Sequence, residues 1–134
     1  MSITLKAYTF ALAAHAAVGQ KRKYTGEDYI HHPVQVANIV YSRGYSDEML
    51  AAAYLHDVVE DTQVTIELIK KEFGKCIATL VAGLTDISKP EDGNRAVRKE
   101  IDRQHTARQS PDCKTIKLAD LISNSKSILQ HDKE

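Results

Sequence analysis

The stretch Leu55-His56-Asp57-Val58-Val59-Glu60-Asp61-Thr62 places four ionisable side chains at the end of an apolar segment. The apolar residues before it recur at helical spacing, which predicts one helix from residue 46 or 47 to about residue 59. On that helix His56 lies one turn before Glu60, and Asp57 lies one turn before Asp61. Three neighbouring carboxylates repel one another, and a divalent metal bound by His56 and Asp57 would offset that repulsion most simply. A solvated acidic helix end with a surface histidine is the alternative for this segment alone.

The hydrophobic period is helical through most of the chain, and alternating β-branched runs between hairpin turns are missing. This pattern predicts an all-α fold. A length of 134 residues is typical of one domain, which we expect to span residues 1–134. The remaining helices are expected at about residues 4–19, 33–44, 65–73, 75–84, 95–107 and 111–130, with a loop over residues 86–94.

Composition excludes several function classes. The 18 Lys and Arg residues balance the 18 Asp and Glu residues, which argues against the broad basic surface that nucleic-acid binding needs. No apolar run reaches the roughly 18 to 20 residues of a membrane span. The two cysteines, Cys76 and Cys113, match no metal or redox spacing, and we expect a cytoplasmic protein. An alanine-rich segment at residues 7–18 imitates a signal peptide, but its polar residues and helical spacing favour an amphipathic helix.

Two further residues are candidate metal ligands. Asp120 lies in an apolar stretch where an unpaired carboxylate would be costly, and Asn124 follows one helical turn later. A partner lysine or a helix N-terminus would be a purely structural explanation for Asp120. Either His31 or His32 could be a metal ligand, and the residue types alone do not decide between them. The position directly before Pro33 favours His32.

A series of motifs in one order extends from about Leu5 to Ile128. It resembles the hydrolase domain of RelA/SpoT-type alarmone enzymes, and more closely the small stand-alone alarmone hydrolases of the HD superfamily. A bare His-Asp pair would be a weak signal, whereas the whole series is specific. The motifs are Ala14-His15, Gly19-Gln20, Lys21-Arg22-Lys23, Gly26-Glu27, Tyr29-Ile30-His31-His32-Pro33, Leu55 to Thr62, Phe73-Gly74, Leu84-Thr85-Asp86 and Lys117 to Asn124.

The resemblance implies a metal site and a reaction. His32, His56, Asp57 and Asp120 match the family's four metal ligands, which usually hold one Mn²⁺ ion. Glu60 and Asp61 match the pair that activates water. In the family this water attacks the 3′-diphosphate of ppGpp or pppGpp, so that pyrophosphate is released and GDP or GTP remains. A bound cation and a nearby carboxylate suit that chemistry.

The resemblance also implies substrate contacts. Arg22 or Lys23 matches a basic residue that lies against the guanine base or its phosphates, although the loop here is one residue longer than is usual. Lys89, after Thr85-Asp86, resembles a segment that reaches the diphosphate, and Asn124 matches an asparagine near the ribose and phosphate. Without the resemblance, Lys21 to Lys23 would be an ordinary solvated basic loop.

The sequence also departs from the family pattern at three other places. They are His31, where an apolar or amide residue is common, Asp28 in place of the usual proline, and an end at Glu134 where many relatives continue with helices that close the pocket.

Two other functions compete with alarmone hydrolysis. One is a phosphohydrolase with a different substrate on the same metal site, such as a nucleotidase or an NADPH phosphatase. The other is a binding module that senses alarmone without catalysis, against which the Glu60-Asp61 pair counts. The sequence leaves the oligomeric state open, with a homodimer among the alternatives.

Overall fold

The structure is a computed structural model that describes residues 2–19 and 30–132, with side chains described as far as residue 126. Within these residues the regular structure is helical and contains no strand, which confirms the all-α prediction. In chain order the elements are α1 (Ile3–Ala17), α2 (His31–Tyr41), α3 (Asp47–Leu55), α4 (Val58–Asp61), α5 (Ile66–Phe73), α6 (Lys75–Leu84), the 3₁₀ turn η1 (Pro90–Asp92), α7 (Arg95–Ala107) and α8 (Pro111–Asp132).

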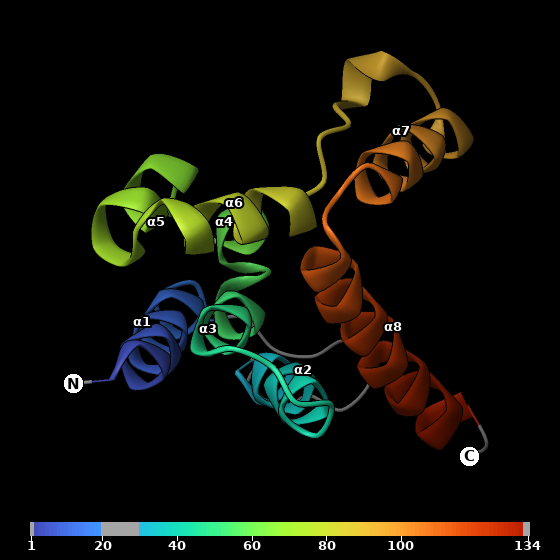
Figure 1. Cartoon of the computed structure of the whole chain (residues 1–134). Coiled ribbons are helices and arrows are strands. Elements are labelled where there is room, and N and C mark those ends of the chain that lie inside the picture. Colours follow the sequence, from blue (N-terminus) through green and yellow to red (C-terminus); the bar gives the residue numbers. More distant parts are fainter. Residues whose placement is uncertain (1, 20–29, 133–134) are drawn as a thin grey trace.

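Helix α3 is the centre of the molecule. It contacts α1, α2, α6 and α8, and Figure 1 shows these helices arranged around it. Its alanines Ala51, Ala52 and Ala53 are fully buried, because small side chains on all sides let the neighbouring helices approach closely. Ser46 begins the helix, and its hydroxyl accepts a hydrogen bond from the Met49 N–H. The opposite end of this helix leads into the turn at His56 and Asp57.

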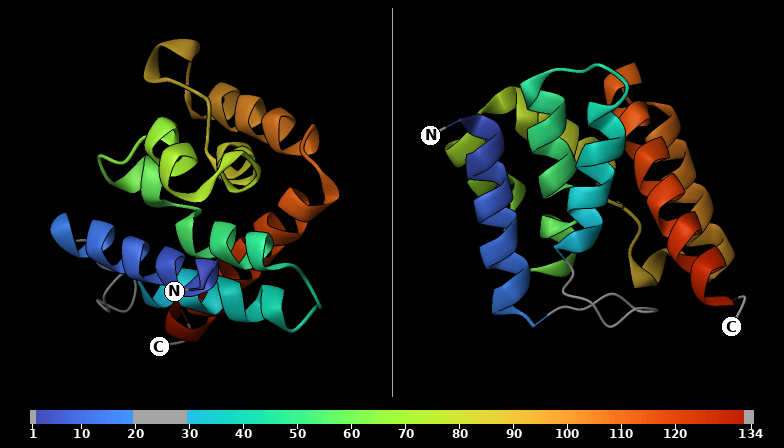
Figure 2. Two further views of the ribbon diagram at one scale, coloured as in Figure 1. Left: turned by 60° about the vertical axis from the view of Figure 1, so that its left-hand side comes forward. Right: turned by 90° about the horizontal axis from the view of Figure 1, so that it is seen from below.

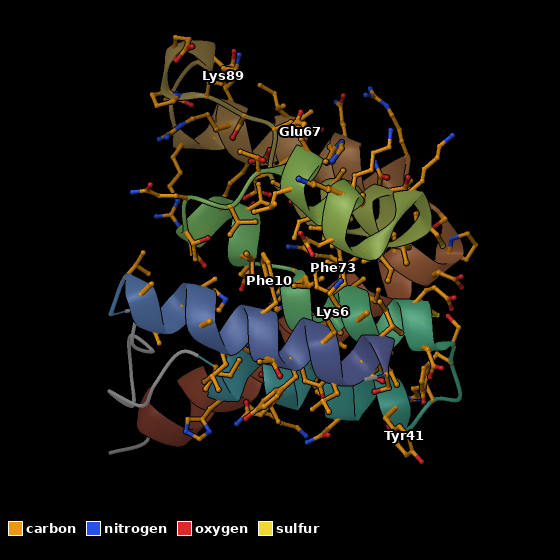
Figure 3. All side chains as sticks on the ribbon, turned by 90° about the vertical axis from the view of Figure 1, so that its left-hand side faces the viewer. Lys6, Phe10, Tyr41, Glu67, Phe73 and Lys89 are labelled. Atoms are coloured by element: carbon orange, nitrogen blue, oxygen red, sulfur yellow. The ribbon has the colours of Figure 1, made fainter. Side chains whose placement is uncertain are left out.

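Helix α1 is tied to α5 at the edge of the core. The Lys6 ammonium donates a hydrogen bond to the Glu72 carbonyl at 2.6 Å and lies 5.0 Å from the centre of the Phe73 ring. Phe10 packs edge-on against Phe73 with ring centroids 5.4 Å apart. Figure 3 shows Lys6, Phe10 and Phe73 gathered where the two helices face each other. These contacts close one side of the core around α3.

The single helix predicted from residue 46 or 47 to residue 59 is wrong in one respect. Helix α3 ends at Leu55, a turn follows at His56 and Asp57, and α4 resumes at Val58. Asp57 has φ −105° and ψ 0°, outside ideal helical values, so the chain is redirected at this residue. The predicted pairs His56 with Glu60 and Asp57 with Asp61 therefore do not lie in rows on one continuous helix.

The segment after α6 departs from the compact body. It contains η1 and leads into α7, which contacts α6 and α8. In Figure 1 and the left view of Figure 2, η1 and α7 lie on the far side of α6 from α1 and α2. The first turn of α7 is capped by Asn94, whose side chain accepts a hydrogen bond from the Val97 N–H. Among the described residues no helix is both long and apolar enough to cross a lipid bilayer.

Candidate metal centre

Four side chains from three parts of the chain converge on one point. His32 lies in the first turn of α2, His56 and Asp57 form the turn between α3 and α4, and Asp120 lies on α8. One ligand atom from each lies within 4.8 Å of the other three. His32 Nε2 is 2.7 Å and His56 Nε2 is 3.2 Å from Asp120 Oδ1, while Asp57 Oδ2 is 2.9 Å from His56 Nε2. This is a compact nitrogen and oxygen donor set of the kind that holds a divalent ion.

The break between α3 and α4 explains how two successive residues reach the same point. Neighbouring side chains on a continuous α-helix are about 100° apart around its axis, so they diverge from each other. The turn at His56 and Asp57 removes this divergence, and both side chains face His32 and Asp120. His31, by contrast, is exposed to solvent.

Buried hydrogen bonds orient both histidine rings. His56 Nδ1 donates to the Ala53 carbonyl at 2.7 Å. Ser123 Oγ donates to Gln35 Oε1 at 2.9 Å, so it accepts from His32 Nδ1, which lies 3.1 Å away. Both rings therefore present Nε2 to the cluster. Outer hydrogen bonds of this type are what metal-binding histidines require.

Electrostatics also favour a cation at this point. Burial acts to lower the pKa of His56, but Asp57 and Asp120 outweigh it, so the pKa is raised well above its usual value. Burial acts to raise the pKa of Asp120, but hydrogen bonds from His32 and His56 outweigh it and lower that pKa. The potential at the cluster is thus negative enough to attract protons, and a divalent ion would satisfy the same potential.

Glu60 projects from α4 beside this cluster. One of its carboxylate oxygens accepts a hydrogen bond from the backbone N–H of Asp86, in the loop after α6. Partial burial raises the pKa of Glu60 to about 7, and the nearby carboxylates of Asp86, Asp57 and Asp61 add to this effect against the lowering effect of the hydrogen bond. A carboxyl group with a pKa near neutrality is suited to accept a proton from water.

The loop that meets Glu60 is anchored by α7. Asp102 accepts hydrogen bonds from the Ile87 and Ser88 N–H groups, both at 2.9 Å, and from the Ser88 hydroxyl at 2.7 Å. Three donors on one carboxylate fix the backbone immediately after Asp86. Helix α7 thus holds the loop in the place where it contacts Glu60.

The remaining predicted site residues are distributed unevenly. Asn124 is close to the cluster, since its amide donates to Asp120 Oδ1 at 3.3 Å. Lys89 is exposed on the loop between α6 and α7 and lies at the top of the molecule in Figure 3, away from α1 and α3. Asp61 is exposed at the end of α4, and Arg22 and Lys23 lie outside the described residues.

Three residues near the centre were not singled out from the sequence. Ser123 and Asp102 act through hydrogen bonds between segments far apart in the chain, and no local pattern marks such contacts. Lys117 contacts Asp120 Oδ2 at 3.5 Å. Its spacing of three residues from Asp120 on a predicted helix was a usable signal.

A model of the family described as the HD domain matches residues 7–133. The match covers nearly the whole chain, and it includes all four clustered residues. The chain belongs to the HD-domain family. Its resemblance to the hydrolase domains of RelA/SpoT-type enzymes is likewise confirmed by individual relatives.

Among the relatives of this HD-domain chain, one from a Synechocystis species is named probable guanosine-3′,5′-bis(diphosphate) 3′-pyrophosphohydrolase and is 39% identical over 126 residues. An Aquifex aeolicus protein named guanosine-3′,5′-bis(diphosphate) 3′-pyrophosphohydrolase is 36% identical over 123 residues. Each alignment covers 92% of this chain but only 16% and 17% of the two relatives. The chain therefore spans about one sixth of the length of these relatives.

A solved structure is similar to this chain over a larger share of its own length than the two relatives are. It is described as a metazoan ortholog of SpoT that hydrolyzes ppGpp, with a TM-score of 0.84 and 30% sequence identity. The alignment covers 96% of this chain and 71% of that protein. The HD-domain fold and its helical framework are thus shared over almost the entire chain.

Proposed function

We propose that this HD-domain chain hydrolyses the 3′-diphosphate of ppGpp or pppGpp, with release of pyrophosphate and of GDP or GTP. One observation carries the proposal: His32, His56, Asp57 and Asp120 offer ligand atoms within 4.8 Å of one another in a chain that is 30% identical to a ppGpp-hydrolyzing protein. The free cysteines Cys76 and Cys113 accord with a cytoplasmic location for this activity.

We propose that the same four residues hold one divalent ion, Mn²⁺ in particular. The donor set of two imidazole nitrogens and two carboxylates suits a fairly hard divalent metal. The hydrogen bonds of His32 to Ser123 and of His56 to Ala53 support this assignment, because they direct both Nε2 atoms to the cluster. When bound, such an ion polarises phosphoryl oxygens and makes water easier to deprotonate.

We assign water activation to Glu60 with Asp61. Glu60 is held through one carboxylate oxygen by the Asp86 N–H, which leaves its second oxygen to act as the proton acceptor. Water oxygen would form a bond to the phosphorus attached to the 3′ oxygen while the carboxylate takes the water proton. The bond from phosphorus to the 3′ oxygen would break, and that oxygen would leave with the electron pair and take up a proton. Pyrophosphate and a 3′ hydroxyl are the balanced products.

Substrate recognition completes the proposal. Asn124, which bonds to Asp120, is assigned to the ribose and phosphate. Arg22 or Lys23 is assigned to the guanine base or its phosphates, and Lys89 to the diphosphate. Lys89 is exposed on the loop between α6 and α7, three residues after Asp86, whose N–H bonds to Glu60.

The test is pyrophosphate release from ppGpp by purified protein with Mn²⁺, by chelator-treated protein and by Asp57→Ala protein. We expect metal-dependent release that falls at least about 100-fold in Asp57→Ala. Asp47→Asn, at the exposed start of α3, is the matched acidic control and should retain activity. Nucleoside monophosphates and NADPH are assayed in parallel.

Each other outcome points to a different function. Metal-dependent phosphate release from a monophosphate or from NADPH, without pyrophosphate release from ppGpp, would replace the substrate and keep the centre. Binding of ppGpp without turnover of any substrate would favour the binding module and overturn hydrolysis. Full activity after chelation would overturn the metal assignment.

A further inference from the structure

Acidic side chains crowd the candidate centre. Besides Asp57 and Asp120, Glu60 lies close enough to Asp61 and Asp86 for their charges to act on it, and Asp57 acts on Asp86. A divalent ion would balance only the charges of the two carboxylates that ligate it. A substrate diphosphate, itself strongly anionic, would still meet the repulsion of the others. Efficient binding therefore calls for a cation from the protein at the same place.

Lys117 supplies such a cation. It lies on α8, one helical turn before Asp120, and its Nζ is 3.5 Å from Asp120 Oδ2. Its positive charge also acts on Asp86, in the loop after α6. Its ammonium thus contacts the metal cluster at Asp120, and its charge also reaches the loop that orients Glu60. The side chain is 29% exposed, so the lysine is partly buried but still reachable from solvent.

The contact with Asp120 does not account for all of this lysine's capacity. An ammonium has three N–H donors, and a 3.5 Å contact engages at most one of them, at the limit of a hydrogen bond. Asp120 already accepts hydrogen bonds from His32, His56 and Asn124 at its other oxygen. Once Asp120 ligates a cation, its charge no longer needs Lys117 for compensation. The ammonium can then serve an incoming anion.

We propose that Lys117 binds the non-bridging oxygens of the 3′-diphosphate and stabilises the negative charge on these oxygens while water attacks the phosphorus. This inference rests on the proposed function and adds to it a substrate contact at the metal centre from α8. It differs from a purely structural role, in which Lys117 would only neutralise Asp120.

The experiment compares wild-type protein with Lys117→Met, which keeps the length of the side chain but removes its charge. Lys114→Met, one turn earlier on α8 and exposed, is the matched control. With Mn²⁺ present, the affinity for inorganic pyrophosphate is measured by calorimetry, and inhibition of ppGpp turnover is measured for pyrophosphate and for GDP. We expect Lys117→Met to weaken pyrophosphate affinity by about 10-fold or more, as the loss of a charged hydrogen bond implies. Inhibition by GDP should change less than about threefold.

Two further measurements separate substrate binding from a structural role. Mn²⁺ affinity should stay equal or increase in Lys117→Met, since a competing positive charge is removed. Lys117→Arg should recover part of the pyrophosphate affinity. Unchanged pyrophosphate affinity in a folded Lys117→Met protein would overturn the inference, and so would a loss of Mn²⁺ affinity that accounts for the whole effect. If Lys117→Met does not fold, Lys117→Gln and Lys117→Arg are compared by the same titration.

The result also distinguishes this inference from the proposed function. A wild-type protein that binds pyrophosphate through Lys117 but releases none from ppGpp would overturn alarmone hydrolysis and retain the diphosphate contact. If wild type hydrolyses ppGpp and Lys117→Met binds pyrophosphate equally well, alarmone hydrolysis is retained and the Lys117 contact is overturned.

Discussion

The carboxylate of Glu60 accepts a hydrogen bond from the backbone N–H of Asp86, and this contact joins α4 to the loop after α6. It connects the acidic residue beside the metal cluster to a segment that is itself fixed by Asp102 on α7. The orientation of Glu60 therefore depends on three parts of the chain.

The first prediction concerns the pH dependence of turnover. With its pKa raised to about 7, Glu60 gains a proton as the pH falls through neutrality and can then no longer accept one from water. We expect kcat/KM for ppGpp to fall on the acidic side, with a midpoint no higher than about 7, because a bound cation lowers this pKa further. Measurements from about pH 5.5 to 8.5 check this.

Glu60→Gln tests whether this acidic limb belongs to Glu60. The amide can still accept the Asp86 N–H but cannot take a proton, so kcat/KM should fall about 100-fold or more and the limb should disappear. Glu67→Gln, an exposed residue on α5 labelled in Figure 3, is the control and should keep the wild-type profile. An unchanged acidic limb in Glu60→Gln would assign the titration to another group.

Glu60 should also make the stability of the metal-free protein depend on pH, and stability should fall where turnover rises with pH. In metal-free protein the folded-state pKa of Glu60, about 7, is above its ordinary value of 4.5. The folded state therefore retains a proton that the unfolded state releases, and stability is lost as the pH rises from about 4.5 to about 7. Glu60→Gln removes this loss, so it should be more stable than wild type at pH 8 and show less difference at pH 5. Urea unfolding in the presence of a chelator measures the free energy of unfolding of both proteins at pH 5 and pH 8. A Glu60→Gln protein less stable than wild type at pH 8 would contradict the expectation.

Asp102 should matter for catalysis although it lies outside the metal cluster. Asp102→Ala removes the acceptor of three hydrogen bonds that hold Ile87 and Ser88. We expect the loop to lose its position, so that kcat falls about tenfold while Mn²⁺ affinity stays within about threefold of wild type. Asp102→Asn keeps one acceptor oxygen, so its kcat should lie between that of wild type and that of Asp102→Ala. Glu100→Ala, on the same helix and bonded to Arg103 and Gln104, is the control and should have wild-type kcat.

Much of the fold was predictable from the sequence because its signals are local. The cap at Ser46 and the helical spacing placed α3, and the start of α7 at Arg95 and the end of α5 at Phe73 were also placed correctly. The break after Leu55 was not predicted, since the apolar pattern continues through Val58 and Val59. The turn at His56 and Asp57 coincides with the metal cluster, so it is set by tertiary contacts that a local pattern does not show.

The candidate site was accessible from the sequence for a different reason. Its four ligands lie in short sequence motifs that resemble those of a known family. The contacts that orient these ligands lie in no such motif. Ser123 reaches His32 across 91 residues of sequence, and Asp102 reaches the loop through backbone amides. Contacts of this kind arise from the packing of α8 on α2 and from the path of the loop, and neither leaves a pattern in the chain itself.

Ser123→Ala should weaken metal binding without touching a ligand. The hydroxyl accepts from His32 Nδ1 and donates to Gln35, so its removal frees the ring to change orientation or tautomer. Loss of such a partner lowers metal affinity about 10 to 100-fold. Competition titration with a Mn²⁺ chelator measures the change. Ser125→Ala, exposed on the same helix, should leave the affinity unchanged, and an equal affinity in Ser123→Ala would mean that His32 needs no outer partner.

Gly83 is required by close packing between α6 and α8. A Cβ at this position would lie 2.8 Å from Cys113 Sγ and 2.5 Å from Gln109 Oε1. Gly83→Ala gains about 1 kcal/mol of helix propensity but incurs about 1 to 3 kcal/mol of overpacking against the buried Cys113, so we expect a net loss of about 1 kcal/mol in the free energy of unfolding. Cys113→Ala removes the obstructing sulfur. In that background Gly83→Ala should be neutral or stabilising, and urea unfolding of the four proteins measures the coupling. An equal loss in both backgrounds would locate the strain at Gln109 instead.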